Sequence, residues 1–123
     1  MLNRLSDAHL QSAGISTSAI FSDLHETQQR KLVKLCAQHN CYEITNHADE
    51  RQHERGITAT QLLNCMKLGI LKAVELGNNA GELKFVLQWR DQKERKDVNV
   101  VVVLWSIRGP ALLITSNLIF VSC

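Results

Sequence analysis

Apolar and polar positions follow two different periods along this chain. Before residue 70 the spacing is helical: residues 26–39 place Leu32, Leu35 and Cys36 three and four positions apart, with polar side chains between them. This pattern indicates an amphipathic helix that stops near Asn40. From residue 70 the period changes to two, and one face of residues 82–90 is apolar: Leu83, Phe85, Leu87 and Trp89. The change predicts helices followed by a sheet.

Capping signals predict two helices on either side of Gly56. Asn46 is the candidate N-cap of a helix over residues 47–55, and Gly56 suits the left-handed position that follows a helix. Thr58 and Gln61 have the spacing of a capping box, which opens a helix over residues 59–68.

The ends of this helical half are less regular. Residues 1–24 predict one short helix that ends at Gly14 and another that Ser16 or Thr17 opens. The β-branched and aromatic run at residues 42–45 is either a strand or an extended segment.

Four strands are expected after residue 69: 70–76, 82–90, 98–107 and 111–121. Residues 98–107 are almost wholly apolar, so we expect this strand to be central with both faces covered. The intervening turns are a glycine-asparagine turn, a charged hairpin loop over residues 91–97 and a turn at residues 108–110. The order of elements predicts an α+β fold in which N-terminal helices pack on a four-stranded antiparallel sheet.

Size and composition fit one globular unit. The 123 residues are 45% hydrophobic and 21% charged, which is enough to bury a core. Residues 1–14 include charged side chains and lack an apolar core, so we expect no signal peptide. The apolar run 100–105 is too short to span a bilayer, and we expect a cytoplasmic protein without membrane contact.

Four cysteines should be reduced thiols in that compartment. Cys36 and Cys41, with His39 between them, can be drawn as part of a zinc site. However, the chain lacks a matching CxxC pair, and closed zinc sites usually need four ligands at recognisable spacing. We therefore expect neither a metal nor another cofactor.

His47, Arg51 and Arg55 recur every four residues and so share one face of the expected helix. Histidine can act as a base or an acid near neutral pH, and arginine binds phosphate through two parallel donors. The three residues, which we call the ladder, fit metal-independent RNA cleavage. The same face also fits a solvated lattice of weak ion pairs, because Glu50 and Glu54 lie three residues from His47 and Arg51.

A second group of cations lies at the expected strand ends. Arg90, Lys93, Arg95 and Lys96 gather at one hairpin and Arg108 at the next turn, while Thr115 interrupts the last strand. These side chains can hold a phosphate backbone or simply face solvent. A net charge of +2 permits RNA binding without requiring it.

Residues 45–69 resemble the domain-of-unknown-function 4258 family. Its pattern places His-Ala, then Arg, then Arg-Gly-Ile, then a helix that ends in glycine, which correspond to His47-Ala48, Arg51, Arg55-Gly56-Ile57 and Gly69. The strands after Gly69 also fit, so the resemblance covers residues 42–117. The chain departs from the pattern at Gln52, where an apolar residue is common, and it adds an N-terminal extension.

That family is similar to the RelE/ParE-like ribonuclease toxin superfamily, in which helices pack on a curved antiparallel sheet. The resemblance implies a helical extension over residues 1–41 and a RelE-like α+β domain over residues 42–123. It also implies RNA cleavage, with His47, Arg51 and Arg55 as catalytic residues. The expected RNA-binding residues are Arg90, Lys93, Arg95, Arg108 and Thr115.

The extension leaves a second class of function open. It can occlude the site, form a homodimer or bind an antitoxin. A non-enzymatic interaction module, such as an antitoxin-like protein or a phage-encoded inhibitor, would use the N-terminal helices and the sheet edge to bind a protein. The expected partners are therefore RNA in the first case and an antitoxin or other protein in the second.

Overall fold

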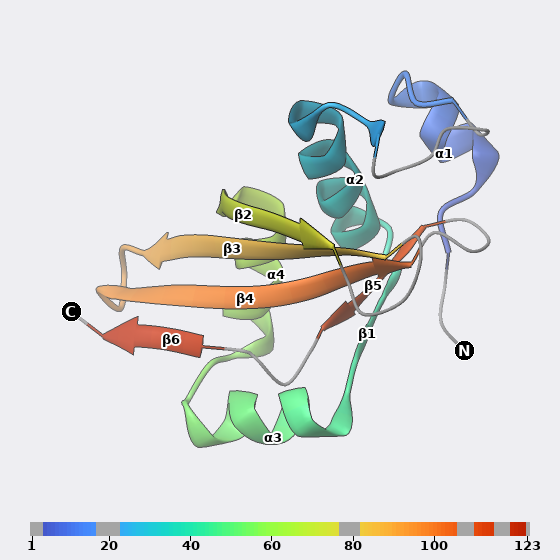
Figure 1. The fold of residues 1–123 in the computed structure, drawn as a ribbon. Coiled ribbons are helices and arrows are strands. Elements are labelled where there is room, and N and C mark those ends of the chain that lie inside the picture. Colours follow the sequence, from blue (N-terminus) through green and yellow to red (C-terminus); the bar gives the residue numbers. More distant parts are fainter. Residues whose placement is uncertain (1–3, 17–22, 77–81, 106–109, 115–118, 123) are drawn as a thin grey trace.

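Helices precede the sheet along the chain, except that one short strand lies between the second and third helices (Figure 1). A computed structural model describes residues 4–16, 23–76, 82–105, 110–114 and 119–122. The helices of this part are α1 (Asp7–Ser12), α2 (Glu26–Gln38), α3 (Asn46–Glu54) and α4 (Ala59–Leu68). Its strands are β1 (Tyr42–Ile44), β2 (Ile70–Leu76), β3 (Leu83–Asp91), β4 (Lys96–Trp105), β5 (Ala111–Ile114) and β6 (Ile119–Ser122).

The strands form one sheet in the order β1-β5-β4-β3-β2, and β6 also pairs with β4. Strands β2, β3 and β4 are antiparallel neighbours, whereas β1 runs parallel to β5. The expected α+β class is confirmed, and so are the antiparallel pairing of β2, β3 and β4 and the central place of β4. The described part has six strands and not four, because β1 joins the sheet and the segment 111–121 contributes to two strands, β5 and β6.

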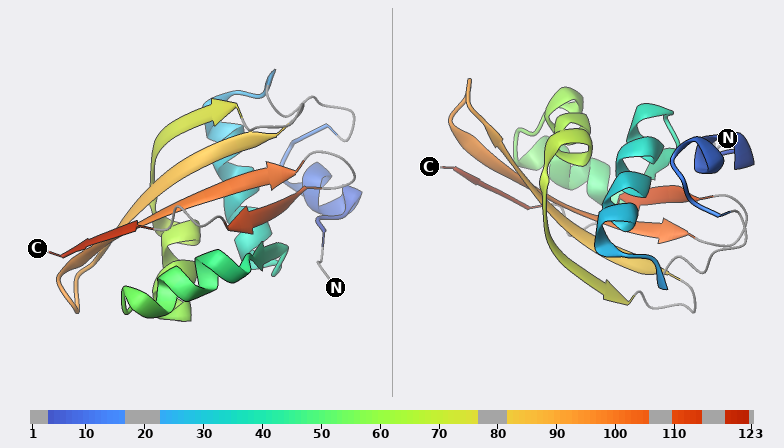
Figure 2. Two further views of the ribbon diagram at one scale, coloured as in Figure 1. Left: turned by 60° about the horizontal axis from the view of Figure 1, so that its bottom comes forward. Right: turned by 90° about the horizontal axis from the view of Figure 1, so that it is seen from above.

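One face of the sheet is covered by helices α2 and α4 (Figure 2). Of the four side chains of β3 that were expected to point inward, Leu83, Phe85 and Leu87 are at most 3% exposed, and Trp89 is partly buried and packs against the core. They meet the buried stripe of α4, which consists of Leu62, Cys65 and Met66. Helix α3 lies beside the end of the sheet formed by β1, β5 and β6 (Figure 1).

The ends of α3 and α4 follow local chemistry. The N-cap of α3 is Thr45 and not the expected Asn46, because the Thr45 hydroxyl accepts a hydrogen bond from the Ala48 N–H at 3.1 Å. Gly56 has the expected left-handed conformation, with φ of 66°. The capping box of Thr58 and Gln61 is confirmed, with both of its hydrogen bonds formed.

The charged hairpin is shorter than expected. Strand β3 continues to Asp91 and β4 begins at Lys96, and these two residues pair directly. The loop therefore contains only residues 92–95, in which Arg95 has a φ of 53°. The second short helix expected after Ser16 falls on residues 17–22, outside the described residues. None of the helices in the described ranges is long and apolar enough to cross a membrane.

Residues before β1 share the core of the sheet. Leu5, Leu10, Leu32 and Val33 belong to the same buried cluster as the inner side chains of β3 and β4. The ring of His9 stacks on that of His39, 4.0 Å between centroids, where α1 meets the end of α2.

Arg30 connects α2 to the C-terminal end of α4. Its guanidinium donates to the carbonyl oxygen of Met66 at 2.9 Å and twice to that of Gly69, at 2.8 and 3.2 Å. The last carbonyls of a helix lack partners within the helix, so Arg30 supplies them from a distant segment. Gly69 is required at this corner because a Cβ there would overlap the carbonyl oxygen of Cys65.

We predict that Arg30→Met lowers the free energy of unfolding by about 1.5–3 kcal/mol, since it removes charge-assisted bonds to two backbone carbonyls. Lys34→Met is the matched control, because Lys34 lies on the exposed face of the same helix. Urea unfolding of both variants measures the difference. Equal stability of the two variants would contradict the role of Arg30.

Candidate ladder and hairpin site

The ladder lies on one flank of α3. Ala48 and Gln52 form the buried stripe of this helix, while His47 and Arg51 are exposed beside it and Arg55 is half-buried at the C-cap. Residues four apart stay on one side of a helix, so the three side chains share this flank. His53 lies on the other flank.

The side chains of His47 and Arg51 face solvent, that of Arg55 is half-buried, and all three are at most weakly paired. The imidazole of His47 is 84% exposed, and its Nδ1 is 4.0 Å from the Glu50 carboxylate. Among the described residues, neither Arg51 nor Arg55 forms an ion pair with a carboxylate. The expected lattice of ion pairs on this flank is thus limited to His47, and both guanidiniums are available to an anion.

The hairpin between β3 and β4 lies at the C-terminal end of the ladder. The ammonium of Lys96 donates to the carbonyl oxygen of Gly56 at 3.1 Å, directly after Arg55. Lys93 and Arg95 are exposed on the same hairpin. The carboxylate of Glu94 lies 3.7 Å from the ammonium of Lys96, so the hairpin has a net positive charge that includes one negative side chain. The structure thus brings Lys96 to the C-terminal end of the ladder, and Lys93 and Arg95 lie on the same hairpin.

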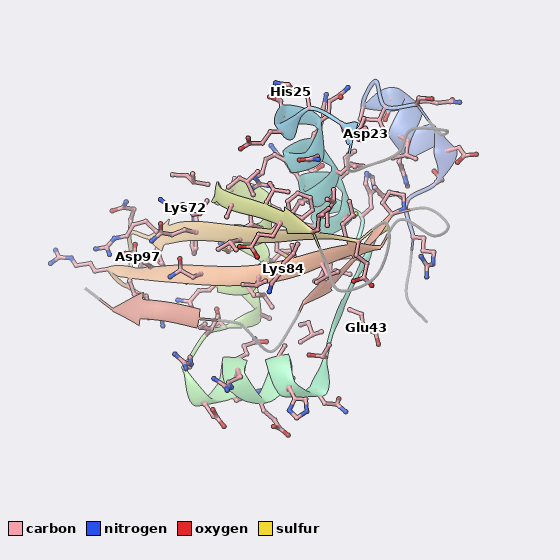
Figure 3. The ribbon with its side chains drawn as sticks, viewed as in Figure 1. Asp23, His25, Glu43, Lys72, Lys84 and Asp97 are labelled. Atoms are coloured by element: carbon pink, nitrogen blue, oxygen red, sulfur yellow. The ribbon has the colours of Figure 1, made fainter. Side chains whose placement is uncertain are left out.

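Arg90 lies elsewhere. Alternation along β3 places it on the face opposite Leu83 and Phe85, away from the helices, where it is 3.3 Å from the carboxylate of Asp97. Figure 3 shows Asp97 and Lys84 on that open face. The structure therefore does not bring Arg90 to the ladder. Arg108 and Thr115, the two remaining expected RNA-binding residues, lie outside the described residues.

A buried hydrogen-bond network joins the hairpin to the start of α4. The side-chain oxygen of Gln61 accepts from the Thr58 N–H at 2.9 Å, and its amide nitrogen donates to the Asp91 carboxylate at 2.8 Å. The other carboxylate oxygen accepts from the backbone N–H groups of Lys93 and Glu94, at 3.0 and 3.2 Å.

These donors stabilise the charged form of Asp91. The hydrogen bond from Gln61 is the largest cause, and together with the two backbone N–H groups it holds the pKa of Asp91 below its ordinary value. The sequence pattern predicted the capping role of Gln61 but not its second partner. An aspartate placed two and three residues before the turn amides was a usable local signal for the hairpin half of this network.

The cysteines of the described part are buried free thiols. Burial raises the pKa of Cys65 to about 12 and also raises the pKa values of Cys36 and Cys41. A thiol that stays protonated is a poor nucleophile and a poor metal ligand. Within the described ranges, three or more His, Cys, Asp or Glu side chains do not gather as a metal site would require.

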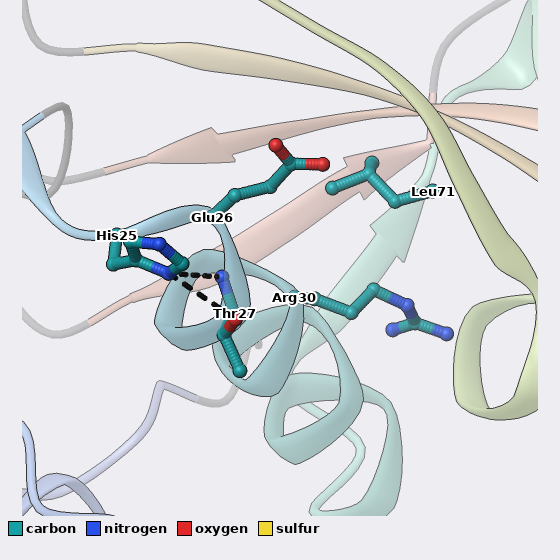
Figure 4. A pocket seen from close by; sticks show the side chains of 5 residues that line it. All are labelled: His25, Glu26, Thr27, Arg30 and Leu71. Carbon is teal, nitrogen blue, oxygen red and sulfur yellow. Dashed lines mark hydrogen bonds between the residues drawn. The ribbon is translucent and has the colours of Figure 1, made fainter.

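A cavity of about 380 Å³ lies between the start of α2 and strand β2, lined by His25, Glu26, Thr27, Arg30 and Leu71 (Figure 4). His25 is committed to capping α2, since its Nδ1 accepts from the Thr27 N–H at 3.2 Å. The guanidinium of Arg30 is occupied by the carbonyls of Met66 and Gly69. Two of the polar side chains that line the cavity are therefore occupied by structural contacts, and the ladder does not line it.

Comparisons with known proteins add no relative: no family model, no curated protein and no solved structure matches this chain. They neither support nor exclude the resemblance of residues 42–117 described above.

Gln52 occupies a position at which the family that residues 42–117 resemble commonly has an apolar residue. Here its polar side chain is buried, which lowers the stability of the fold. Its side chain is 7% exposed, and its Oε1 has no hydrogen-bond partner among the described residues. A buried acceptor without a partner loses its hydration and gains nothing in return.

We predict that Gln52→Met, which keeps the length of the side chain, raises the free energy of unfolding by about 1 kcal/mol. Gln38→Met on the exposed face of α2 is the control for a general effect of the substitution. Thermal and urea unfolding measure both. A Gln52→Met variant no more stable than the parent would show that the amide oxygen is satisfied in solution.

Proposed function

We propose that this chain is a metal-independent endoribonuclease of the toxin type, with His47 as general base or acid. The observation that carries the proposal is the ladder, in which neither guanidinium forms an ion pair with a carboxylate of the described residues. It continues into the cationic hairpin through the contact of Lys96 with Gly56. Along the chain, α3 and α4 lie between β1 and β2, two strands of the same sheet. This order supports a RelE-like assignment, because that resemblance implies helices packed on an antiparallel sheet.

The chemistry requires one proton acceptor and stabilisation of negative charge. His47 accepts the proton of a 2′-hydroxyl, the 2′-oxygen attacks the adjacent phosphorus, and the bond from phosphorus to the 5′-oxygen breaks. The products are a 2′,3′-cyclic phosphate and a 5′-hydroxyl, which takes its proton from the imidazolium or from water. Arg51 and Arg55 stabilise the charge on the phosphate oxygens. Lys93, Arg95 and Lys96 hold the neighbouring backbone.

We predict that the purified chain cuts RNA in the presence of a chelator and leaves cyclic-phosphate ends. His47→Ala should slow the cleavage by at least about 100-fold, since it removes the general base. His53→Ala is the matched control, because His53 is an exposed histidine of the same helix on the other flank. Fragments are followed by gel electrophoresis with all proteins purified in parallel. Equal rates for the parent and His47→Ala would end this assignment.

A specific observation favours the second candidate, an interaction module. The large apolar side chains that are exposed in the described part are Leu68, Ile70 and Leu76, at 62%, 69% and 79%, and all lie in or beside β2. Strand β2 is an edge of the sheet, so its outer backbone groups are open to another strand. Exposed apolar side chains at such an edge are a feature of protein-binding surfaces.

If β2 binds a protein, replacing Ile70 and Leu76 together by Thr should abolish co-purification of a partner at fixed stoichiometry. Lys72→Thr, on the same strand, is the control and should keep the partner. Size-exclusion chromatography with light scattering measures the complexes. A parent protein that runs alone as a monomer and cuts RNA would reject the module in favour of the nuclease.

A further inference from the structure

The hairpin and the corner between α3 and α4 are joined by two contacts, of which the proposed function uses only that of Lys96. The corner holds Gly56 and Thr58, and the hairpin holds Lys93, Arg95 and Lys96. Lys96 reaches the corner from outside, through one bond to Gly56. Gln61 and Asp91 connect the same two segments from inside, where they are 4% and 9% exposed.

The polarity of the inner connection is fixed. The Asp91 carboxylate can only accept hydrogen bonds, so the Gln61 amide nitrogen must face it and the Gln61 oxygen must face the Thr58 N–H. The Asp91 oxygen that faces the loop is likewise occupied by two backbone donors. Each polar atom of this pair therefore has a determined partner, and changing the donor or acceptor character of either residue leaves two like groups in contact.

We propose that Gln61 and Asp91 are positioning residues that hold the cationic hairpin at the end of the ladder. The inference rests on the proposed function, in which the hairpin binds the RNA backbone. Neither side chain touches RNA in this scheme. They act through the loop, because Asp91 fixes the amides of Lys93 and Glu94, and Gln61 fixes Asp91 to the start of α4.

Two single substitutions and their combination test this directly. Gln61→Glu keeps the capping box but sets a second carboxylate against Asp91, and Asp91→Asn sets an N–H donor against another donor. The double variant reverses the polarity of the bond: the new amide on β3 would donate to the new carboxylate on α4 and still accept from the loop amides. Its net charge equals that of the parent. Gln92→Glu, an exposed loop substitution, controls for the added negative charge.

The first measurement is hydrogen exchange at the backbone amides of Lys93 and Glu94. Each single variant should speed exchange by about 10-fold or more, as expected when a hydrogen bond to a charged group is lost, and the double variant should restore protection. Gln92→Glu should leave it unchanged. Unchanged exchange in the single variants overturns the inference. So does loss of protection throughout the sheet, because Gln61 and Asp91 would then stabilise the fold and not the hairpin.

The second measurement is affinity for a labelled 2′-O-methyl oligouridylate, which cannot be cleaved through its 2′-oxygen. Both single variants should bind more weakly than the parent and the double variant should recover. Asp91→Asn is decisive, since removal of a negative charge alone would strengthen binding to a polyanion. If the amides of Lys93 and Glu94 exchange faster but the affinity for the oligouridylate is unchanged, the positioning role is overturned. If the parent protein does not bind the probe, the proposed function is rejected. The exchange data still show whether the contact between Gln61 and Asp91 orders the hairpin.

Discussion

Side-chain hydrogen bonds connect each end of α4 to a distant segment, its start to the β3–β4 hairpin and its end to α2. A helix leaves N–H groups unpaired at its start and carbonyl groups unpaired at its end. At the start, Gln61 satisfies the Thr58 N–H and also reaches Asp91 on the β3–β4 hairpin. At the end, Arg30 of α2 satisfies Met66 and Gly69. The β3–β4 hairpin and helix α2 are therefore both connected to one helix, α4.

Local sequence patterns were sufficient to predict the helix ends and strand faces that depend on residues close together in the chain. The spacing of Thr58 and Gln61 predicted the start of α4. Gly56 predicted the end of α3, because the left-handed backbone conformation that follows a helix favours glycine. Alternation along residues 82–90 predicted the buried face of β3. Four-residue spacing alone also placed His47, Arg51 and Arg55 on a common flank.

Contacts and strand pairings between residues far apart in the chain could not be predicted from local sequence patterns. Strand β1 has three residues and pairs with β5 about seventy positions later, so nothing in its own sequence determines a parallel partner. The contacts of Arg30 span 36 and 39 residues. For Arg90, the alternation that placed Leu83 and Phe85 inward already pointed it outward. Grouping it with the hairpin cations followed position along the chain and overlooked the face of the sheet.

The open setting of the ladder determines how its charges can act. Two unit charges 4 Å apart interact by only about 1 kcal/mol in bulk water, so guanidiniums on an exposed helix flank give an isolated phosphate little stabilisation. In the proposed function, an RNA strand that runs from the hairpin to His47 would change this, because it would make several phosphate contacts at once and displace water from the flank that it covers. RNA binding at the hairpin and the proposed chemistry at the ladder would then be coupled through one strand. In this scheme the geometry of that coupling depends on two contacts between the hairpin and the α3–α4 corner, that of Lys96 with Gly56 and the buried one of Gln61 with Asp91.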